Sequence, residues 1–443
     1  MFYTIFRAFL IFCLHVMYRR IEAPGVETIP SRGGVLLVAN HGNALMDPLL
    51  LLVLLRREIT FLAKHTLFPM PLVGFVLKRI GGVPVYRRQE APGESARNEA
   101  TLDQCGAQLA SGGVVCLFPE GVSHNAPKLL SLRSGAARIY FRAARPGVAD
   151  PMIVPSGIHP ESKRAFRARV LVVFGPPIAT SGLVEMERRQ AGAGVAELTR
   201  RIETGLASLV PGLDTWEELA FLRDVRSFHV GRYGESLTEE AVSLRRFIQA
   251  YRTYRETNPA EVSAIRQRWE AYRRQLRRFS IRDTWVTLSQ TPVRAARFFL
   301  ASALVMVAVF PLAVAGWIAH YPAYWLCGAL ERRFNRFEDQ SATFRLMAGI
   351  ILFPLSYAVI LAVLAWTRGG RAALIGAVLL PACGWAALRL SEERQRLKEA
   401  AKALRLAFVP GKAVEEIRRE RQEILLSVAR LLRAHPPEAA AQR

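Results

Sequence analysis

Two long apolar runs in the carboxyl-terminal third constrain the fold of this chain most strongly. Phe298 to Ala319 and Leu346 to Trp366 each continue for about twenty residues without a charge, enough for a helix to cross a hydrocarbon core of ~30 Å. A shorter run, Ala373 to Leu390, contains a proline, a glycine and an arginine, and we expect a third span or a re-entrant segment there. Residues 298–390 are therefore predicted to be a membrane region with two or three hydrophobic segments.

The positive charge of the chain narrows the choice of partners. The sequence has 60 Lys and Arg against 37 Asp and Glu, a net charge of +23, which predicts attraction to polyanions. Because 51% of the residues are hydrophobic and no nucleic-acid module is recognisable, we expect anionic membrane lipid as a partner and no nucleic acid. Arginines precede the first span and follow the third run, so an odd number of spans conflicts with the positive-inside rule.

Three further regions surround the membrane segments and the domain described below. Residues 1–22 are apolar around Arg7 and lack a small-residue cleavage site, which predicts an N-terminal membrane anchor or interfacial helix. Residues 181–297 are charged, with apolar residues three and four apart, and are predicted to be a helical accessory region. Residues 391–443 are expected to form a basic amphipathic tail that can lie along a headgroup layer.

Residues 23–180 alternate short apolar, β-rich runs with helical stretches, a pattern typical of an α/β domain. We expect a layered, mixed or largely parallel sheet with helices on both faces, because most of the strands read as buried on both sides. The predicted strands are Val35–Ala39, Ile59–Ala63, Val83–Tyr86, Val114–Phe118, Met152–Gly157 and Val170–Phe174, and the predicted helices are Leu45–Arg57, Leu72–Ile80, Ala96–Ala110 and Gly135–Ala144.

A histidine and an aspartate follow the first of these strands. His41 lies in the turn between strand and helix, and Asp47 lies in the first turn of the helix, where its carboxylate can reach one imidazole nitrogen. Such a carboxylate fixes the tautomer and stabilises the imidazolium that forms when the histidine takes a proton. The alternative is a turn histidine capped by Asn43, with Asp47 favoured only by the helix dipole.

Three more elements lie at predicted strand ends, where open α/β sheets collect ligands. Gly82 opens a strand that ends in Arg87, whose guanidinium suits a phosphate, although a solvated basic turn is an equal alternative. Glu120 and Gly121 follow the next strand, and Lys128 and Arg133 lie beyond them as weaker cationic helpers or plain surface charges. His124 is a second candidate base, ranked below His41. The strand that reaches Pro155 is the fourth element.

The order of these motifs over Ala23 to Pro177 resembles the glycerolipid acyltransferase superfamily, of the 1-acylglycerol-3-phosphate acyltransferase type. The motifs are Asn-His…Asp, Gly-x-x-(apolar)-x-Arg, Phe-Pro-Glu-Gly and a Val-Pro strand. Five residues separate His41 from Asp47, where the familiar motif has four, and the form His-x-Asn-x-x-x-Asp-Pro is similar to the fungal-type glycerol-3-phosphate/dihydroxyacetone-phosphate acyltransferases and their bacterial relatives. The difference leaves the acceptor open.

The resemblance implies an O-acyltransferase that moves an acyl chain from acyl-CoA or acyl-carrier protein to glycerol 3-phosphate or lysophosphatidate, without a cofactor. His41 would be the general base oriented by Asp47, Arg87 would hold the acceptor phosphate, and Asn43, Gly82, Glu120, Gly121, Lys128 and Arg133 would line the pocket. Another lysophospholipid acceptor and a catalytically silent, lipid-binding scaffold are the alternatives. The Ala- and Arg-rich composition indicates a bacterial inner membrane, with the catalytic domain on the cytoplasmic side.

The sequence offers no sign of an acyl-enzyme or of a metal site. It contains no Gly-x-Ser-x-Gly elbow. Its five cysteines lie far apart without a CxxC pair and are predicted to be buried thiols: Cys13, Cys105, Cys116, Cys327 and Cys383.

Overall fold

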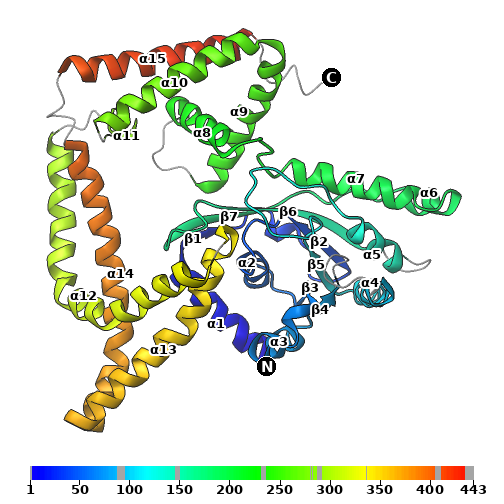
Figure 1. The fold of residues 1–443 in the computed structure, drawn as a ribbon, viewed down its shortest axis with the longest axis horizontal. Coiled ribbons are helices and arrows are strands. Elements are labelled where there is room, and N and C mark those ends of the chain that lie inside the picture. The colour runs from blue at the N-terminus through cyan, green and yellow to red at the C-terminus, as the bar shows by residue number, and fades with distance from the viewer. Residues whose placement is uncertain are drawn as a thin grey trace. The chain divides into compact units, whose positions relative to one another are not determined.

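The structure is a computed structural model, and it describes residues 2–86, 95–144, 150–230, 236–279, 281, 283–286, 292–335, 337–404 and 411–434 (Figure 1). Its contacts divide the chain into two compact units. The first, which we call the sheet unit, comprises Met1–Leu219, Ser236–Glu240 and Asn335–Leu346. The second, the helical unit, comprises Ala220–Glu235, Ala241–Phe334 and Met347–Arg443.

A seven-stranded sheet of described residues forms the centre of the sheet unit, in the order β1-β7-β6-β2-β5-β3-β4. Neighbouring strands run parallel except β6 and β7, which pair antiparallel. The prediction of an α/β fold with a mixed, largely parallel sheet is therefore confirmed. The strands are β1 (Tyr18–Glu22), β2 (Val35–Ala39), β3 (Ile59–Lys64), β4 (Val83–Val85), β5 (Val114–Leu117), β6 (Met152–Pro160) and β7 (Ala168–Phe174).

Helices cover both faces of this sheet, and Figure 1 shows α1 and α2 on one side with α5 and α7 on the other. Leu36 and Val38, which point to one face of β2, pack with buried residues of α4, α5 and α7 in a single apolar core. The helices are α1 (Phe2–Met17), α2 (Met46–Leu54), α3 (Pro71–Arg79), α4 (Ser95–Ala110), α5 (Gly135–Ala143), α6 (Leu183–Arg189) and α7 (Ala193–Ala207), with short 3₁₀ turns at Val26–Thr28 and His65–Leu67.

The N-terminal segment contains one element that the sequence does not predict. Helix α1 ends at Met17, and Tyr18–Glu22 forms the edge strand β1, paired parallel to β7. Leu10 and Leu14 of α1 are buried, whereas Phe12 is 66% exposed. A helix that buries one side and exposes an apolar side chain on the other agrees with the expected interfacial role, which stays a prediction.

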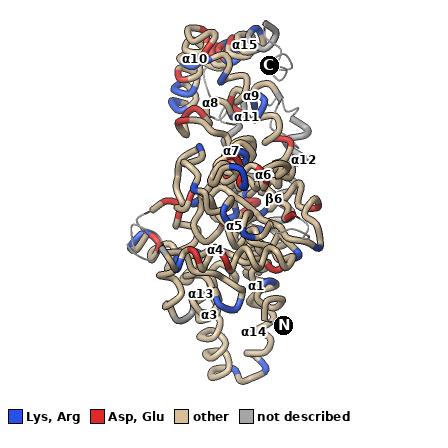
Figure 2. The backbone as a smooth tube through the Cα atoms, turned by 90° about the vertical axis from the view of Figure 1, so that its right-hand side faces the viewer, with Lys and Arg blue, Asp and Glu red and all other residues tan. Residues whose placement is uncertain are grey.

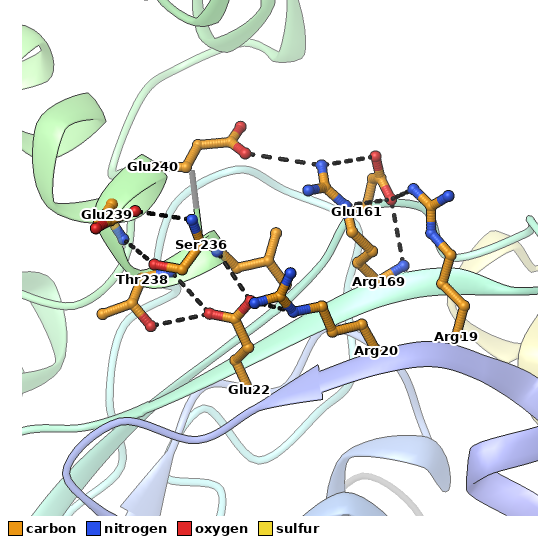
Figure 3. Close-up of polar contacts among 10 residues, drawn as sticks. Arg19, Arg20, Glu22, Glu161, Arg169, Ser236, Thr238, Glu239 and Glu240 are labelled. Atoms are coloured by element: carbon orange, nitrogen blue, oxygen red, sulfur yellow. Dashed lines mark hydrogen bonds and ion pairs between the residues drawn. The ribbon is translucent and has the colours of Figure 1, made fainter. Parts of the chain in front are cut away.

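Residues 236–240 attach to β1 through the charged network of Figure 3. They open α9 (Leu237–Thr257), and Glu22 accepts hydrogen bonds from Leu237 N (3.0 Å), Thr238 N (3.1 Å) and Thr238 Oγ1 (3.1 Å). These N–H groups belong to the first turn of a helix, which has no partners for them inside the helix. Burial raises the pKa of Glu22, but the hydrogen bonds outweigh it, and the pKa lies below its ordinary value.

In the helical unit, α15 (Gly411–Ala434) packs on α10 (Pro259–Arg278). Arg268 pairs with Glu423 at 2.8 Å, and the apolar residues Ile417 and Ile424 of α15 are buried. Part of the apolar side of this helix is therefore covered by protein, while Leu426 is 52% exposed, and the expected place of the tail along a headgroup layer stays a prediction. The unit also contains most of α8 (Trp216–Val230) and the short helix α11 (Asp283–Val286).

Three helices of the described residues are long and apolar enough to cross a membrane: Met306–Phe334, Glu338–Arg368 and Gly370–Arg394. They lie within α12 (Pro292–Phe334), α13 (Ser341–Arg368 with the preceding 3₁₀ turn Glu338–Gln340) and α14 (Gly370–Leu404). Helix α14 continues through Pro381 without a break, which favours a third span over a re-entrant segment. Figure 2 shows basic residues at the turn between α13 and α14.

Candidate active site at the strand ends

His41 and Asp47 meet at the carboxyl end of β2. His41 Nδ1 lies 3.0 Å from Asp47 Oδ2, and the same oxygen accepts a hydrogen bond from Asn43 N at 2.8 Å. Asp47 is only 1% exposed, so this carboxylate is held rigidly and away from water. An ionised carboxylate can only accept hydrogen bonds, so Nδ1 must carry a proton, and in the neutral imidazole Nε2 keeps its lone pair.

The backbone of His41 is fixed by the loop that follows β5. His41 N donates to Glu120 Oε1 at 2.9 Å, and His41 O accepts from His124 N at 3.0 Å. The imidazole also stacks on the ring of Phe118, with centroids 4.1 Å apart. The two strand-end motifs therefore form one structure, in which the second loop supports the candidate base.

His124, the second candidate base, has both ring nitrogens engaged. Its Nδ1 accepts from Ala126 N at 3.1 Å, and its Nε2 lies 2.5 Å from Glu120 Oε2, so the proton is on Nε2. Among the described residues no hydrogen-bond partner is found for His41 Nε2. The geometry therefore supports the ranking of His41 above His124.

Glu120 connects the two loops rather than facing an open pocket. Besides His41 N and His124, it accepts a hydrogen bond from Leu130 N at 2.8 Å, and the residue is 3% exposed. Gly121 beside it has φ = 75°, and a Cβ there would lie 2.8 Å from Arg133 Nε. The side chain of Arg133 thus lies against Gly121, which glycine alone allows at little steric cost.

The other predicted pocket residues have different surroundings. Lys128 is half exposed and pairs with Asp214 at 3.1 Å. Gly82 packs on the end of α3, where an added Cβ would lie 2.9 Å from Leu77 O. Asn43 is 1% exposed, and neither its side-chain nitrogen nor its oxygen has a hydrogen-bond partner within the structure as described.

Arg87 lies outside the described residues, but the strand end that leads to it is described. Asn98 of α4 accepts from Tyr86 N at 3.0 Å and donates to Tyr86 O at 2.6 Å. The ring of Tyr86 also stacks on His65, with centroids 4.8 Å apart. The residue directly before Arg87 is thus anchored to two elements, and the phosphate role of Arg87 stays a prediction.

The structure adds residues that the sequence did not indicate. Lys163, in the turn after β6, donates to His124 O at 3.2 Å and to Asn125 Oδ1 at 2.9 Å. Its ammonium lies 3.3 Å from where a Cβ on Gly42 would be. Lys163 stands in a polar Glu-Ser-Lys-Arg stretch that reads as a surface turn, so no sequence signal marks it.

Two buried thiols of the sheet unit lack the features of a nucleophile. None of the five cysteines forms a disulfide, and four of them are buried. Burial raises the pKa of Cys105 to about 12 and raises that of Cys116 as well, which disfavours the reactive thiolate. Within the described part of the chain no three His, Cys, Asp or Glu side chains are grouped to hold a metal ion.

Two family models match this chain. Residues 20–159 match the acyltransferase family, and residues 234–440 match the Glycerol-3-phosphate acyltransferase 2 C-terminal domain. The first range contains the site described above up to β6, and the second contains the candidate membrane helices.

Individual relatives agree with these matches. The chain is 25% identical to Glycerol-3-phosphate O-acyltransferase 2 of Saccharomyces cerevisiae, over 76% of this chain and 49% of the relative. It is 22% identical to an uncharacterized acyltransferase of Schizosaccharomyces pombe, over 95% and 79%. It is 28% identical to the 1-acyl-sn-glycerol-3-phosphate acyltransferase of Borreliella burgdorferi, over 28% and 47%. The chain thus spans about half the length of the first and third relatives, and the two yeast relatives do not support a bacterial inner membrane.

Proposed function

We propose a function for this chain from the premise that it carries the acyltransferase domain of the glycerolipid acyltransferase superfamily, together with the C-terminal domain of its fungal-type branch. That resemblance, expected from the motifs, is confirmed by both family models. The proposed function is membrane-bound O-acyl transfer from acyl-CoA or acyl-carrier protein to a hydroxyl of glycerol 3-phosphate or lysophosphatidate in phospholipid synthesis. The observation that carries it is the His41–Asp47 pair, with Nε2 of His41 left without a partner among the described residues.

In the proposed reaction His41 acts as general base and then as general acid. Nε2 takes the proton of the acceptor hydroxyl as its oxygen attacks the thioester carbonyl carbon. The tetrahedral intermediate then collapses, the C–S bond breaks, and the imidazolium returns the proton to the departing thiolate. Asp47 accepts from Nδ1–H throughout and stabilises the cationic ring, so acyl transfer needs neither a covalent acyl-enzyme nor a cofactor.

The thioester oxygen gains negative charge in this step and needs a hydrogen-bond donor. Gly42 follows His41 directly, and its N–H has no hydrogen-bond partner in the described part of the chain. A backbone N–H fixed beside the base suits this role because it needs no rearrangement as the charge develops. We therefore assign Gly42 N–H as a donor to the thioester oxygen.

The acceptor and the membrane complete the proposal. Arg87 is assigned to the acceptor phosphate, since it follows the anchored Tyr86 at the end of β4. The three candidate spans hold the protein in the membrane, where the acyl chain of its substrates lies. A cytoplasmic position of the sheet unit stays a prediction.

A single assay tests the proposed function. Membranes containing the chain receive acyl-CoA and either glycerol 3-phosphate or lysophosphatidate, and the products are separated by headgroup and number of acyl chains. We expect His41→Ala to abolish transfer, while His15→Ala, which changes an exposed histidine of α1, stays fully active. Equal product from the His41→Ala protein would favour the lipid-binding scaffold instead, and transfer only to other lysophospholipids would favour that acceptor class.

A further inference from the structure

The start of the second candidate membrane helix contacts the active-site loops directly. Asn335–Leu346, which we call the connector, leads from the end of α12 into the first turns of α13 and belongs to the sheet unit. Asp339 Oδ2 accepts from Ser123 Oγ at 2.5 Å, Glu338 Oε2 accepts from Asn125 Nδ2 at 2.6 Å, and Thr343 Oγ1 accepts from Leu45 N at 3.2 Å. Two of these partners lie in the loop after β5, which hydrogen-bonds the backbone of His41. The third, Leu45, lies in the turn between His41 and Asp47, just before α2.

One of these contacts orients the side-chain amide of Asn125. The ionised carboxylate of Glu338 can only accept, so it must face the NH₂ group of the amide. The amide oxygen Oδ1 is therefore turned to the other side, where it accepts from Lys163 Nζ at 2.9 Å. A chain of contacts thus runs from the connector through Asn125 to Lys163.

Lys163 is placed next to the candidate base. Its Nζ lies 3.3 Å and its Cε 3.6 Å from the position of a Cβ on Gly42, the residue that follows His41. An ammonium has three N–H donors, and the described residues engage two of them, through His124 O and Asn125 Oδ1. The ammonium also faces the ring of Trp216, with 5.7 Å from Nζ to the ring centroid, and one N–H is not used by these two hydrogen bonds.

Burial and nearby carboxylates act on this ammonium in opposite directions. Burial is the larger effect and lowers the pKa of Lys163, while the carboxylates of Asp47, Asp339, Glu338 and Glu120 favour the charged form. A partly desolvated cation interacts with an anion more strongly than one in bulk water, because water screens the charge less. Since both the acceptor and CoA carry phosphate, the ligand chemistry that fits is a phosphate group.

We propose that Lys163 is a further substrate-binding residue of the acyltransferase site, which holds the acceptor phosphate beside His41. Glu338 of the connector is a positioning residue that acts on Lys163 through Asn125. The inference rests on the proposed function, since it assigns a ligand to the same site. It also makes the connector, more than 200 residues from His41 in sequence, part of the acceptor pocket.

The test is a steady-state comparison of Lys163→Met with the wild type, using glycerol 3-phosphate or lysophosphatidate, whichever the wild type acylates. A charge-assisted hydrogen bond to phosphate predicts an acceptor KM raised roughly tenfold to a hundredfold, with the acyl-CoA KM unchanged. The matched control is Lys78→Met, which changes an exposed lysine of α3 and is expected to leave both KM values unchanged.

A second donor identifies which phosphate is bound. With acyl-pantetheine, which lacks the nucleotide of CoA, the acceptor defect of Lys163→Met should persist. A defect confined to the CoA donor would overturn the proposal by assigning Lys163 to the donor phosphates. An unchanged acceptor KM in an otherwise active variant would overturn it too.

The connector is tested by Glu338→Gln, alone and combined with Lys163→Met. We expect a smaller rise in acceptor KM for the single variant, and a double variant no worse than Lys163→Met alone, because the two residues act in series. Additive effects would contradict the positioning role. If Lys163→Met does not accumulate as folded protein, Lys163→Gln is used instead, because its amide keeps a neutral N–H donor of similar reach. The acceptor KM is again expected to rise. A wild type without any acyl transfer would overturn the proposed function itself.

Discussion

Replacement of Asp47 by asparagine isolates the electrostatic part of the proposed mechanism. Both hydrogen bonds to the Asp47 carboxylate, from His41 Nδ1 at 3.0 Å and from Asn43 N at 2.8 Å, end on the same oxygen, Oδ2. The amide oxygen of an asparagine in this place can accept both bonds. The tautomer of His41 is then kept, and only the negative charge is lost.

The size of the effect follows from the separation of the charges. Two opposite unit charges about 4 Å apart attract by about 4 kcal/mol at an effective dielectric constant of about 20. The imidazole carries only part of a positive charge in the transition state, so about half of this, ~2 kcal/mol, is lost. Since ~1.4 kcal/mol corresponds to a factor of ten, we expect Asp47→Asn to lower kcat by about thirtyfold, and by more than roughly tenfold in any case.

The assay is steady-state acyl transfer, with kcat and the acceptor KM determined separately. The acceptor KM should change little, because Asp47 acts through His41 and is itself buried. Asp103→Asn is the matched control: Asp103 is an exposed aspartate of α4 paired with Arg142, and its loss should leave kcat unchanged. A kcat for Asp47→Asn close to that of the wild type would remove Asp47 from the mechanism.

Three further predictions concern single positions. Arg87→Ala should raise the acceptor KM with little change in the acyl-CoA KM, and a selective effect on the donor would contradict its phosphate role. The depressed pKa of Glu22 stabilises the fold above the ordinary value of 4.5 and loses this contribution as the pH falls through the folded-state pKa. The unfolding temperature of Glu22→Gln should therefore be lower than that of the wild type at pH 7, and the difference should shrink below pH 4.5. A difference that does not change with pH would refute this role. Ala44→Gly should raise the free energy of unfolding by up to about 1 kcal/mol, because Ala44 has φ = 29°, and a less stable variant would contradict strain there.

The α/β core could be predicted from sequence because its signals are local. The run Val35–Ala39 is continuous and apolar, and all five of its residues are buried in β2. Strand β1 could not be predicted, because Tyr18–Glu22 lies at the edge of the sheet, contains two arginines and follows an apolar run that predicts a membrane anchor or interfacial helix. An edge strand buries little, so its sequence need not be apolar. Its place beside β7 depends on a pairing partner about 150 residues away in sequence.

In the candidate site, too, local sequence patterns are predictable and contacts between distant segments are not. His41 and Asp47 are recognisable because a strand-to-helix turn brings residues six apart within hydrogen-bond reach, at 3.0 Å. Glu120 is recognisable as a residue after a buried strand, but its actual contacts, to His41 N and His124, depend on how two loops pack. The connector contacts depend on the path of the chain through its membrane helices, about which local sequence carries no signal. Local patterns therefore find the base, while the packing of distant segments determines what holds it.

The additional residue between His41 and Asp47 is accommodated in the turn itself. Asn43 O accepts from Met46 N at 2.8 Å and from Asp47 N at 3.3 Å, and Ala44 adopts a positive φ between these donors and their acceptor. This compact turn brings the Asp47 carboxylate back to His41 Nδ1 despite five intervening residues. On its far side Leu45 N donates to Thr343 of the connector, so the turn contacts the segment that we propose to position Lys163. The His41–Asp47 turn, with its additional residue, is thus in direct contact with the connector. We infer that the two function together, because a protein without the connector would have to support this turn in another way.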